Sequence, residues 1–372
     1  MSQWRKDFTL GSETYLLNHS VGRPLRSVEK DFSDQFFAPW LNSEGEAWGG
    51  WVKTLEEFHV NLGKIFNSAA DNFCSQVNNS AALSKIVGSL PRLQKHKSVV
   101  LMSEIDFPSM GYALRAALPD QAQIRFIPES ESISDYATWD KHLTSDVDFV
   151  FISHAYSNTG QQAPLKPIVE KARSIKAITL IDVAQSAGVL PLDLAEINPH
   201  FLIGSCVKWL CGGPGSAFLW VHPEQVGECT PREVGWFSHE NPFAFDIHHF
   251  AYHKSAMRFF GGTPSVAPLA IANSSLRYLS QVGVGQIRQH NQMLLDHAIA
   301  SLEKYVVSPV DQRQRSGTLV LSFGEKQEAM IAHLKSKNIK FDVRKTGLRF
   351  SPHLYNSIGD IDELTQSVQS FK

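Results

Sequence analysis

Lys208 and Asp182 are the residues whose chemistry stands out in the sequence, because each lies at the end of a short apolar run. A lysine amine can form a Schiff base with an aldehyde. A carboxylate can keep a pyridine nitrogen protonated, so that the ring withdraws electrons from a substrate carbanion. Most lysines are solvated surface residues, so position rather than residue type carries the argument. The pair predicts pyridoxal phosphate chemistry, with Lys208 and Asp182 as the catalytic residues.

The apolar runs that precede these residues are predicted to be buried strands of a mainly parallel sheet. They span residues 178–181 and 201–206, and polar or turn residues bound each of them. In open α/β sheets, ligands bind outside the carboxyl ends of the strands, which is where Asp182 and Lys208 fall. The run GGPG at 212–215 then prevents a regular helix and lets the backbone pass close to a bound group.

Similar apolar runs recur before and after this pair, with helical stretches between several of them. The predicted strands are 98–102, 124–127, 147–152, 178–181, 201–206 and 217–221, and the predicted helices include 165–175 and 80–90, the latter with Ser80 near its N-cap. This alternation predicts a doubly wound α/β domain. After Pro264 the pattern changes to that of a second, α+β domain. It comprises a long helical stretch at 266–305, a strand at 318–323, a helix at 326–337, strands at 339–343 and 348–351, and a closing helix at 360–371.

The composition narrows the class of protein. A chain of 372 residues with 43% hydrophobic content fits two domains better than one, and its net charge of −2 gives no electrostatic case for nucleic acid or an anionic membrane. No signal-peptide core and no run of about 18 apolar residues is present, so we expect a cytoplasmic, soluble protein. The four cysteines lack CxxC spacing and are expected to be free thiols. The histidines at 239, 248, 249 and 253 form no regular HxxxH face, so no metal site is predicted.

Four motifs carry a resemblance to a known family. They are DVAQSAG at 182–188, KWLCGGPG at 208–215, VGWFSH at 234–239 and GGTP at 261–264. Through them the chain resembles the class V aminotransferase family of fold-type I pyridoxal phosphate enzymes, and within it the kynureninase branch. The resemblance implies an α/β fold with a large, doubly wound, mainly parallel sheet domain and a smaller α+β C-terminal domain. The expected division is an N-terminal arm at 1–35, the large domain at 36–260 and the small domain at 261–372.

The resemblance also implies roles around the cofactor. Lys208 would hold pyridoxal 5'-phosphate as a Schiff base, Asp182 would contact the pyridine nitrogen and Gln185 the ring hydroxyl. Phe107 would stack on the ring, although a loop phenylalanine packed into the core is the competing interpretation. In the family, the residues matching Trp236 and Thr263 reach the cofactor phosphate, the threonine from the neighbouring subunit. A homodimer with shared active sites follows from that similarity.

Asn79, Ser80 and Ala81 are the candidate phosphate ligands within this chain. A helix N-terminus supplies unpaired backbone N–H groups and a partial positive charge, and these residues begin the helix predicted at 80–90. The family places its phosphate at the same point. An ordinary N-cap accounts for Ser80 alone, so the physical argument and the resemblance together favour phosphate binding.

The substrate candidates lie at both ends of the chain and after one central strand. The run GLRFSPHLYN at 347–356 resembles the class V ending, and Arg349 there offers a planar fork to an α-carboxylate, with Arg344 the weaker candidate. His19 belongs to the run NHSVGRP at 18–24, which resembles the family's loop over the substrate site. His154 matches the first position of the kynureninase His-x-Asn-Tyr-x-Thr-Gly motif. The side-chain pocket itself stays open, with Trp48, Trp51, His19 and Tyr156 as candidates.

Two departures from the kynureninase pattern leave the reaction open. Val207 stands where kynureninase has a tyrosine immediately before the lysine, and Ser157 replaces the tyrosine of the motif. The chain has no cysteine after Cys229, which argues against a desulfurase or selenocysteine lyase. We rank kynureninase-type cleavage or related side-chain chemistry on a small α-amino acid first and transfer of the amino group to a keto acid second. A non-catalytic homologue that uses the fold for binding is the third alternative, although a scaffold has no need of Asp182, Lys208 and Arg349 together.

Overall fold

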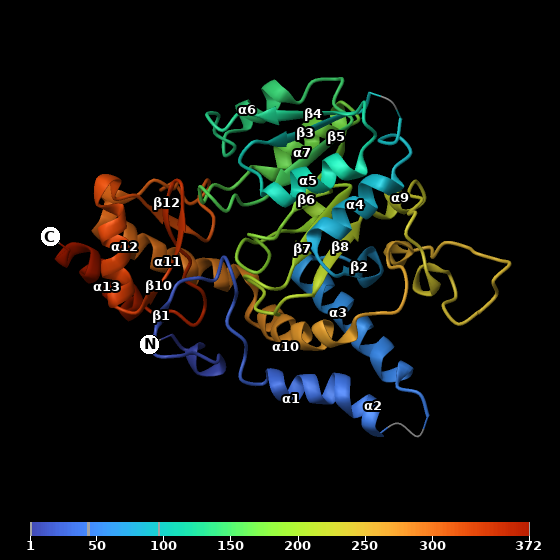
Figure 1. The fold of residues 1–372 in the computed structure, drawn as a ribbon, viewed down its shortest axis with the longest axis horizontal. Helices are drawn as coiled ribbons and strands as arrows, with labels where there is room; N and C mark the ends of the chain where they lie inside the picture. Colours follow the sequence, from blue (N-terminus) through green and yellow to red (C-terminus); the bar gives the residue numbers. More distant parts are fainter. Residues whose placement is uncertain (1, 43–44, 96, 372) are drawn as a thin grey trace.

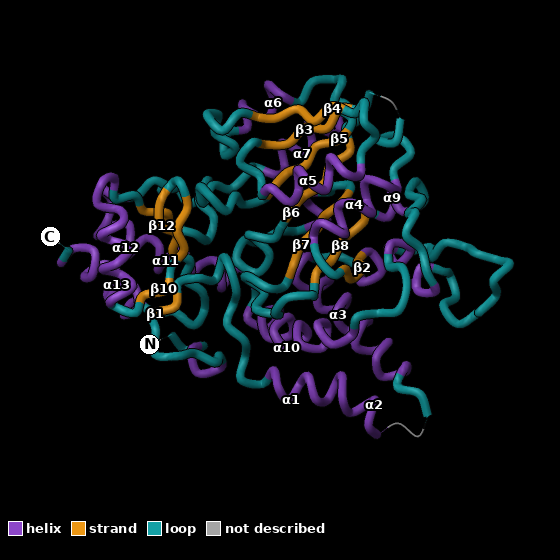
Figure 2. The backbone as a smooth tube through the Cα atoms, in the orientation of Figure 1, coloured by secondary structure: helices purple, strands orange, loops and turns teal. Residues whose placement is uncertain are grey.

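A seven-stranded sheet forms the centre of the molecule in the computed structural model, which describes residues 2–42, 45–95 and 97–371. Its strand order is β2-β8-β7-β6-β5-β3-β4 (Figures 1 and 2). The strands are β2 (Phe73–Gln76), β3 (Val99–Ser103), β4 (Gln123–Ile127), β5 (Phe149–Ser153), β6 (Ile178–Asp182), β7 (Phe201–Ser205) and β8 (Ala217–Val221). β8 is antiparallel to both of its neighbours, β2 and β7, and the other pairings in this sheet are parallel. The predicted mainly parallel sheet is confirmed. The edge strand β2 was missed, because four residues are too few to show a period.

Helices cover both faces of this sheet, as the doubly wound prediction requires. On one face lie α4 (Asn79–Ser89) and α5 (Pro108–Ala117); on the other lie α3 (Trp48–Phe66), α6 (Tyr136–His142), α7 (Leu165–Ser174) and α10 (Val266–Val282). Successive side chains of a strand point to opposite faces. Val100 and Met102 of β3 therefore belong to the core under α4 and α5, whereas Leu101 belongs to the core on the other face.

The C-terminal part of the chain has a core of its own beside the large sheet. Its elements are α11 (Val284–Leu302), α12 (Gln327–Ser336), α13 (Ile358–Ser370) and an antiparallel sheet of β9 (Leu319–Leu321), β11 (Asp342–Arg344) and β12 (Gly347–Phe350). These elements lie at the left of Figure 1. The α+β character predicted for this region is thus present. The predicted strand 339–343 is divided into β10 (Ile339–Lys340) and β11, which pair with different partners.

The helical stretch predicted at 266–305 is interrupted at Gly283. This glycine has a φ of 85°, a left-handed conformation that ends α10 and lets α11 start in a new direction. Leu269 and Leu276 of α10 pack in the core of the large sheet, whereas Leu294 and Leu295 of α11 pack in the C-terminal core. We therefore propose a domain boundary near Gly283, although residue 261 was the position predicted from sequence.

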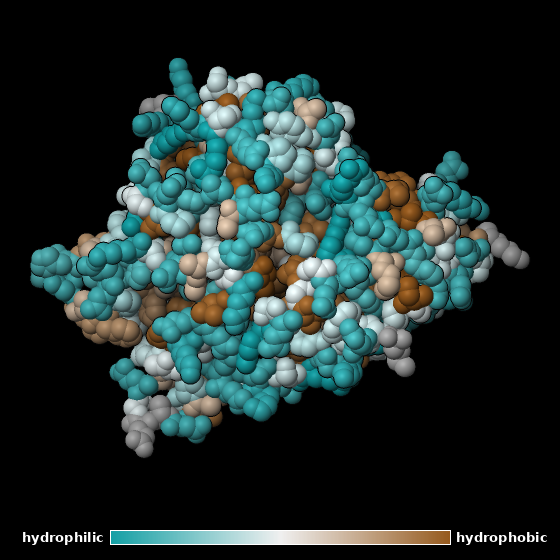
Figure 3. All heavy atoms as spheres, turned by 180° about the vertical axis from the view of Figure 1, so that it is seen from behind, coloured by the Kyte–Doolittle hydropathy of each residue, from teal (hydrophilic) through white to brown (hydrophobic). Residues whose placement is uncertain are grey.

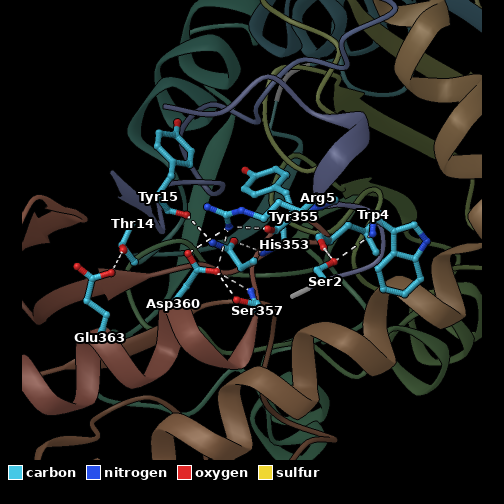
Figure 4. A network of polar contacts seen from close by, with 12 residues as sticks. Ser2, Trp4, Arg5, Thr14, Tyr15, His353, Tyr355, Ser357, Asp360 and Glu363 are labelled. Atoms are coloured by element: carbon cyan, nitrogen blue, oxygen red, sulfur yellow. Dashed lines mark hydrogen bonds and ion pairs between the residues drawn. The ribbon is translucent and has the colours of Figure 1, made fainter. Parts of the chain in front are cut away.

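The N-terminal arm, which we define as residues 2–27, contacts the C-terminal part through hydrogen bonds and an ion pair (Figure 4). Arg5 Nη1 donates to the Tyr355 carbonyl at 3.0 Å and forms an ion pair with Asp360 at 3.1 Å. Further along the arm, β1 (Thr14–Tyr15) pairs in parallel with β10. The same arm then reaches the large sheet, where the Gly22 N–H donates to the Val207 carbonyl at 2.9 Å. The arm thereby connects the C-terminal part to the segment that carries Lys208.

The remaining helices are short. They are α1 (Val28–Phe32), α2 (Ala38–Asn42), α8 (Leu194–Ile197), α9 (Pro223–Val226), a π-helical turn (Ser33–Phe37) and 3-10 turns at Arg5–Asp7, Ala70–Asn72, Trp236–Ser238, Ala256–Phe259, Glu303–Tyr305 and Gly324–Lys326. Apolar patches interrupt the mostly hydrophilic face seen in Figure 3. Phe245 and Ile247, on the loop after Trp236, are 77% and 93% exposed. No helix in the described ranges is long and apolar enough to cross a membrane.

Candidate active site

A cavity of about 280 Å³ opens at the carboxyl ends of the central strands. Ser153, Asp182 and Ser205, the last residues of β5, β6 and β7, form part of its wall. The other lining residues are Asn78, Asn79, Ser80, Ile105, Phe107, Ser109, Met110, Ala155, Tyr156, Ser157, Ala184, Gln185, Val207 and Lys208. The fold therefore brings together Lys208, Asp182, Gln185, Asn79, Ser80 and Phe107, six of the residues predicted from sequence. They meet here because parallel strands end at one edge of a sheet.

Lys208 lies three residues beyond β7, in a tight turn in which the Cys211 N–H donates to the Lys208 carbonyl at 3.0 Å. The N-terminal arm covers this turn closely, since a Cβ on Gly22 would lie 2.2 Å from that same carbonyl oxygen. Burial lowers the pKa of the Lys208 amine, Arg349 adds to this effect and Asp182 opposes it. Lowering the pKa favours the neutral amine, which is the nucleophilic form.

Asp182 is buried at the end of β6, with 7% of its surface exposed. Its Oδ1 accepts from Asn79 Nδ2 at 3.0 Å and from the Ala184 N–H at 2.8 Å. Burial raises the pKa of the carboxyl group, while the Ala184 N–H, Lys208 and Asn79 oppose the shift. The two bonds hold the carboxylate in a defined orientation at the cavity wall, as a partner for a ring nitrogen requires.

The N-terminus of α4 faces the same cavity. Asn78, not Ser80, is the N-cap residue: its side chain accepts from the Ala81 N–H at 2.8 Å. Sequence could have indicated this, because asparagine ranks with serine as an N-cap and precedes the apolar run. Ser80 lies in the first turn and lines the cavity, whereas Ala81 contributes its N–H to the cap and lines a neighbouring pocket. The free N–H groups of this 11-residue helix provide a place for an anion.

Gln185 and Phe107 occupy other walls of the cavity. Gln185 Nε2 donates to the His19 carbonyl at 3.1 Å, and its Oε1 accepts from Trp209 Nε1 at 3.3 Å. Phe107 is 54% exposed, so it is not a core residue, and its ring centroid lies 5.9 Å from Lys208 Nζ. The exposure of Phe107 favours the ring-stacking interpretation over the core one.

The donor set of this cavity fits pyridoxal phosphate. Lys208 offers an amine to the cofactor aldehyde, and Asp182 offers a carboxylate to its pyridine nitrogen. The exposed ring of Phe107 can stack on the face of the pyridine ring, and the N-terminus of α4 can bind the phosphate. Asn79 adds a buried Oδ1 without a hydrogen-bond partner on the same wall. That free polar atom leaves capacity for one more hydrogen bond at the cavity.

Arg349 lies behind the wall of the cavity rather than in it. Its Nη1 donates to the Ser157 carbonyl at 2.7 Å, and Ser157 is a lining residue. Its Nε donates to Asp342 Oδ2 at 2.9 Å, and its Nη2 donates to the same oxygen. Burial lowers the pKa of Arg349 and Asp342 opposes this. Sequence reasoning missed Asp342, although Arg349 and Asp342 stand directly opposite each other on neighbouring strands.

The two histidines predicted to bind substrate differ in position. His19 is buried near Gln185, and its Nδ1 lies 2.7 Å from Ser351 Oγ. His154 lines a different cavity, which residues of α7 also line. The preceding residue, Ser153, faces the Lys208 cavity, and successive side chains of a strand point to opposite faces of the sheet. Burial lowers the pKa of His154 to about 3. The geometry therefore gives His154 no contact with the Lys208 cavity.

The remaining predicted residues lie outside the cavity of their own chain. Trp236 Nε1 donates to Thr263 Oγ1 at 3.3 Å, so these two side chains are neighbours. Neither residue lines the Lys208 cavity. Trp48 and Trp51 pack against each other in an aromatic cluster, and Trp48 also contacts Trp236. Of the four side-chain-pocket candidates, only Tyr156 lines the cavity.

Asp106 is a buried carboxyl group near this cavity that the sequence patterns did not reveal. Its Oδ1 accepts from Ser153 Oγ at 2.7 Å and its Oδ2 from the Ser103 N–H at 2.7 Å. Burial raises the pKa of Asp106 to about 7, and the nearby Asp182 raises it further while both hydrogen bonds lower it. An aspartate just before the candidate stacking aromatic Phe107 was the available signal.

Asp106→Asn is expected to weaken a pH dependence of folding stability. The pKa of Asp106 is about 7 in the folded protein against an ordinary value of 3.8, so between these values the folded protein holds a proton that the unfolded chain releases. Raising the pH through this window therefore lowers wild-type stability, by on the order of a few kcal/mol. Denaturant titrations at about pH 5 and about pH 8 should give a smaller difference for the variant. An equal difference in both proteins would contradict the prediction.

Comparison with known proteins agrees with the pyridoxal phosphate site that the geometry of the cavity indicates. The family model described as Aminotransferase class-V matches residues 52–364. An uncharacterized aminotransferase, YcbU of Bacillus subtilis, is 26% identical over 357 residues, which are 95% of this chain and 94% of the relative. A kynureninase of Deinococcus radiodurans is 26% identical over 378 residues, covering 96% of this chain and 90% of the relative.

Solved structures confirm the fold. A mutant of C-DES with glycine covalently linked to its PLP cofactor superposes with a TM-score of 0.89 at 18% identity, covering 100% of both chains. The apo cysteine desulfurase of Thermococcus onnurineus NA1 superposes with a TM-score of 0.86 at 17% identity, covering 98% of this chain and 96% of that one. At such low identity these two structures establish the architecture and leave the reaction open.

Proposed function

Because the chain belongs to the class V aminotransferase family and is a pyridoxal-phosphate-dependent enzyme, we propose that Lys208 is the residue that holds the cofactor covalently. The observation that carries this proposal is the shared cavity of Lys208 and Asp182 at the carboxyl ends of β6 and β7. Lys208 is the only lysine among the described residues that line this cavity. Its lowered pKa supports the role, since a neutral amine is the form that attacks an aldehyde.

We propose the following division of work among the chain's own residues. When bound, pyridoxal phosphate supplies an electron sink for negative charge that develops at the substrate α-carbon. Asp182 would keep a proton at the ring nitrogen, and the α4 N-terminus with Ser80 would hold the phosphate. Lys208 Nζ would take and return the proton at the substrate α-carbon. The N-terminal arm, through Gly22, packs against the backbone of the turn that carries Lys208.

For the reaction itself we propose cleavage or related chemistry at the side chain of a small α-amino acid, with amino-group transfer as the second candidate. The relatives support both, since one is named a kynureninase and another an aminotransferase. Val207 lines the cavity and has no hydroxyl to donate, which weighs against kynurenine as the substrate. The non-catalytic alternative is set aside, because the chain is an enzyme.

Incubation of the cofactor-loaded protein with a panel of amino acids separates the two reactions. Release of alanine and a side-chain acid supports hydrolytic cleavage. Loss of the visible cofactor absorption with formation of a keto acid supports amino-group transfer. A protein that turns over no member of a panel covering small, aromatic, acidic and sulfur-containing side chains would contradict the proposed substrate class.

Arg349→Ala is expected to weaken substrate binding much more than cofactor binding. A buried guanidinium that pairs with a carboxylate contributes about 2–5 kcal/mol, so KM should rise by roughly 30-fold or more. Spectral titration with pyridoxal phosphate should show little change in cofactor affinity. Arg313→Ala, which removes an exposed surface arginine, is the matched control. Equal losses in substrate and cofactor affinity would argue against the role of Arg349.

We further propose a homodimer in which Trp236 and Thr263 complete the partner's active site. Their position outside their own chain's cavity supports this, as do the exposed Phe245 and Ile247 on the adjoining loop. If each site combines Lys208 of one chain with Thr263 of the other, mixed dimers of Lys208→Ala and Thr263→Ala chains contain one intact site. Subunit mixing should then restore activity that neither variant has alone, and no recovery would refute the shared site.

A further inference from the structure

We assign binding of the substrate carboxylate to Arg349, and the carboxylate of Asp342 already contacts this arginine. Asp342 and Arg349 are cross-strand partners in β11 and β12, whose connection is only Lys345 and Thr346. Opposite residues of antiparallel strands have adjacent side chains, so the pairing follows from the register. Asp342 Oδ2 takes both the Nε–H and an Nη2–H of Arg349. One edge of the guanidinium is therefore already occupied.

The charges in this cluster leave room for one further negative charge. Arg344 Nε lies 3.3 Å from Asp342 Oδ2, so two guanidinium groups share one carboxylate. Among the described residues, the other titratable group paired with Asp342 is His19. Its Nε2 lies 3.9 Å from Oδ2, and its pKa is lowered well below its ordinary value by burial and by Arg349, Lys208 and Arg344. The imidazole is thus neutral. Two positive charges and one negative charge leave a single unbalanced positive charge.

A third nitrogen of Arg349 bonds to the wall of the cavity. Nη1 bonds to the carbonyl of Ser157, a lining residue, so the guanidinium lies one residue behind the cavity wall. Arg349 is 3% exposed, whereas the side chains of Asp342 and Arg344 are 27% and 46% exposed. Asp342 and Arg344 are therefore the more open members of the cluster, and Arg349 is the buried one.

We propose that Asp342 determines the substrate class: the enzyme accepts amino acids with one carboxylate and an uncharged side chain, and it rejects dicarboxylic amino acids such as aspartate and glutamate. The inference rests on the proposed role of Arg349. One substrate carboxylate neutralises the remaining positive charge, whereas a second would be repelled by the fixed carboxylate of Asp342 in the same cluster. Without Asp342, the two arginines would form a site for two carboxylates.

The test measures binding of unreactive acids to the cofactor-loaded enzyme by calorimetry, with propionate as the monocarboxylate and succinate as the dicarboxylate. The wild type should prefer propionate. Asp342→Asn, which keeps the side-chain size and removes the charge, should shift the preference toward succinate by on the order of tenfold or more. Asp342→Ser should shift it in the same direction and serves as the second variant if the first misfolds. Asp311→Asn removes an equal charge from a surface ion pair and should shift nothing.

Three outcomes would overturn the inference. Equal weakening of both acids by Asp342→Asn would mean that Asp342 only orients Arg349. An unchanged ratio of the two affinities would mean that its charge does not reach the ligand. Binding of both acids that is unaffected by Arg349→Ala would place the carboxylate site elsewhere. The binding measurement requires no turnover, so it does not depend on the proposed reaction. Failure of that reaction would appear in the amino acid panel, and failure of the role of Lys208 would appear as a missing cofactor adduct.

Discussion

Replacing Lys208 with alanine is expected to leave a folded protein that binds no cofactor covalently and has lost nearly all turnover. No other lysine among the described lining residues can substitute for its amine. Loss of a positioned proton-transfer group alone costs about 10²- to 10⁴-fold in rate, and loss of the covalent attachment adds to this. Folding should not suffer, because the variant removes a buried amine whose charged form burial already disfavours.

Borohydride reduction followed by peptide mass spectrometry measures this effect directly. The wild type should carry a reduced cofactor adduct on the peptide containing Lys208, and the variant should carry none. Lys64→Ala, which removes an exposed lysine outside the Lys208 cavity, is the control and should keep the adduct. A stable adduct in the Lys208→Ala protein would disprove the assignment, whatever its activity.

Asp182→Asn is expected to retain cofactor but lower turnover by on the order of 10²- to 10³-fold, the usual effect of removing one preorganised electrostatic group. Asparagine has the same shape, and its oxygen can still accept from Asn79 Nδ2 and the Ala184 N–H. The variant loses the negative charge that keeps the ring nitrogen protonated. The effect should therefore fall on kcat more than on cofactor affinity.

Asp106→Asn is the matched control for this variant. Asp106 is likewise a buried carboxyl group, near the Lys208 cavity, but it bonds to Ser153 and the Ser103 N–H and is not a lining residue. Steady-state kinetics of the two variants should show a large loss for Asp182→Asn and a small one for Asp106→Asn. Equal losses would indicate a general effect of replacing a buried carboxyl group near the cavity and not a specific role of Asp182.

The parts of the site that follow strands could be predicted because their signals are local. An apolar run of five or six residues predicts a buried strand, and the residue after it then falls at the sheet edge. Asp182 and Lys208 were located in this way, and β8 was predicted residue for residue at 217–221. The cofactor chemistry followed from these two residue types, and the family resemblance agreed with it.

The structure departs from the predicted positions where these depended on the direction of a side chain, a single backbone angle or the choice of cap. His154 directly follows a strand residue that lines the cavity, and a shift of one residue along a strand moves a side chain to the opposite face. The helix at 266–305 continues in composition through Gly283, and only a positive φ there divides it between two cores. Ser80 was predicted near the N-cap of its helix, and the cap itself is Asn78, a residue type that caps as well as serine.

The sequence by itself determined the cofactor prediction, because a lysine and an aspartate at the ends of two apolar runs indicate pyridoxal phosphate, and it left the reaction open. The tertiary structure decided what surrounds that pair. It placed Asp342 on Arg349 through the register of a hairpin, and it brought Gly22 onto the lysine turn from the other end of the chain. Residue type and strand position are properties of short segments, whereas the charge partner of a buried arginine depends on how distant segments pack.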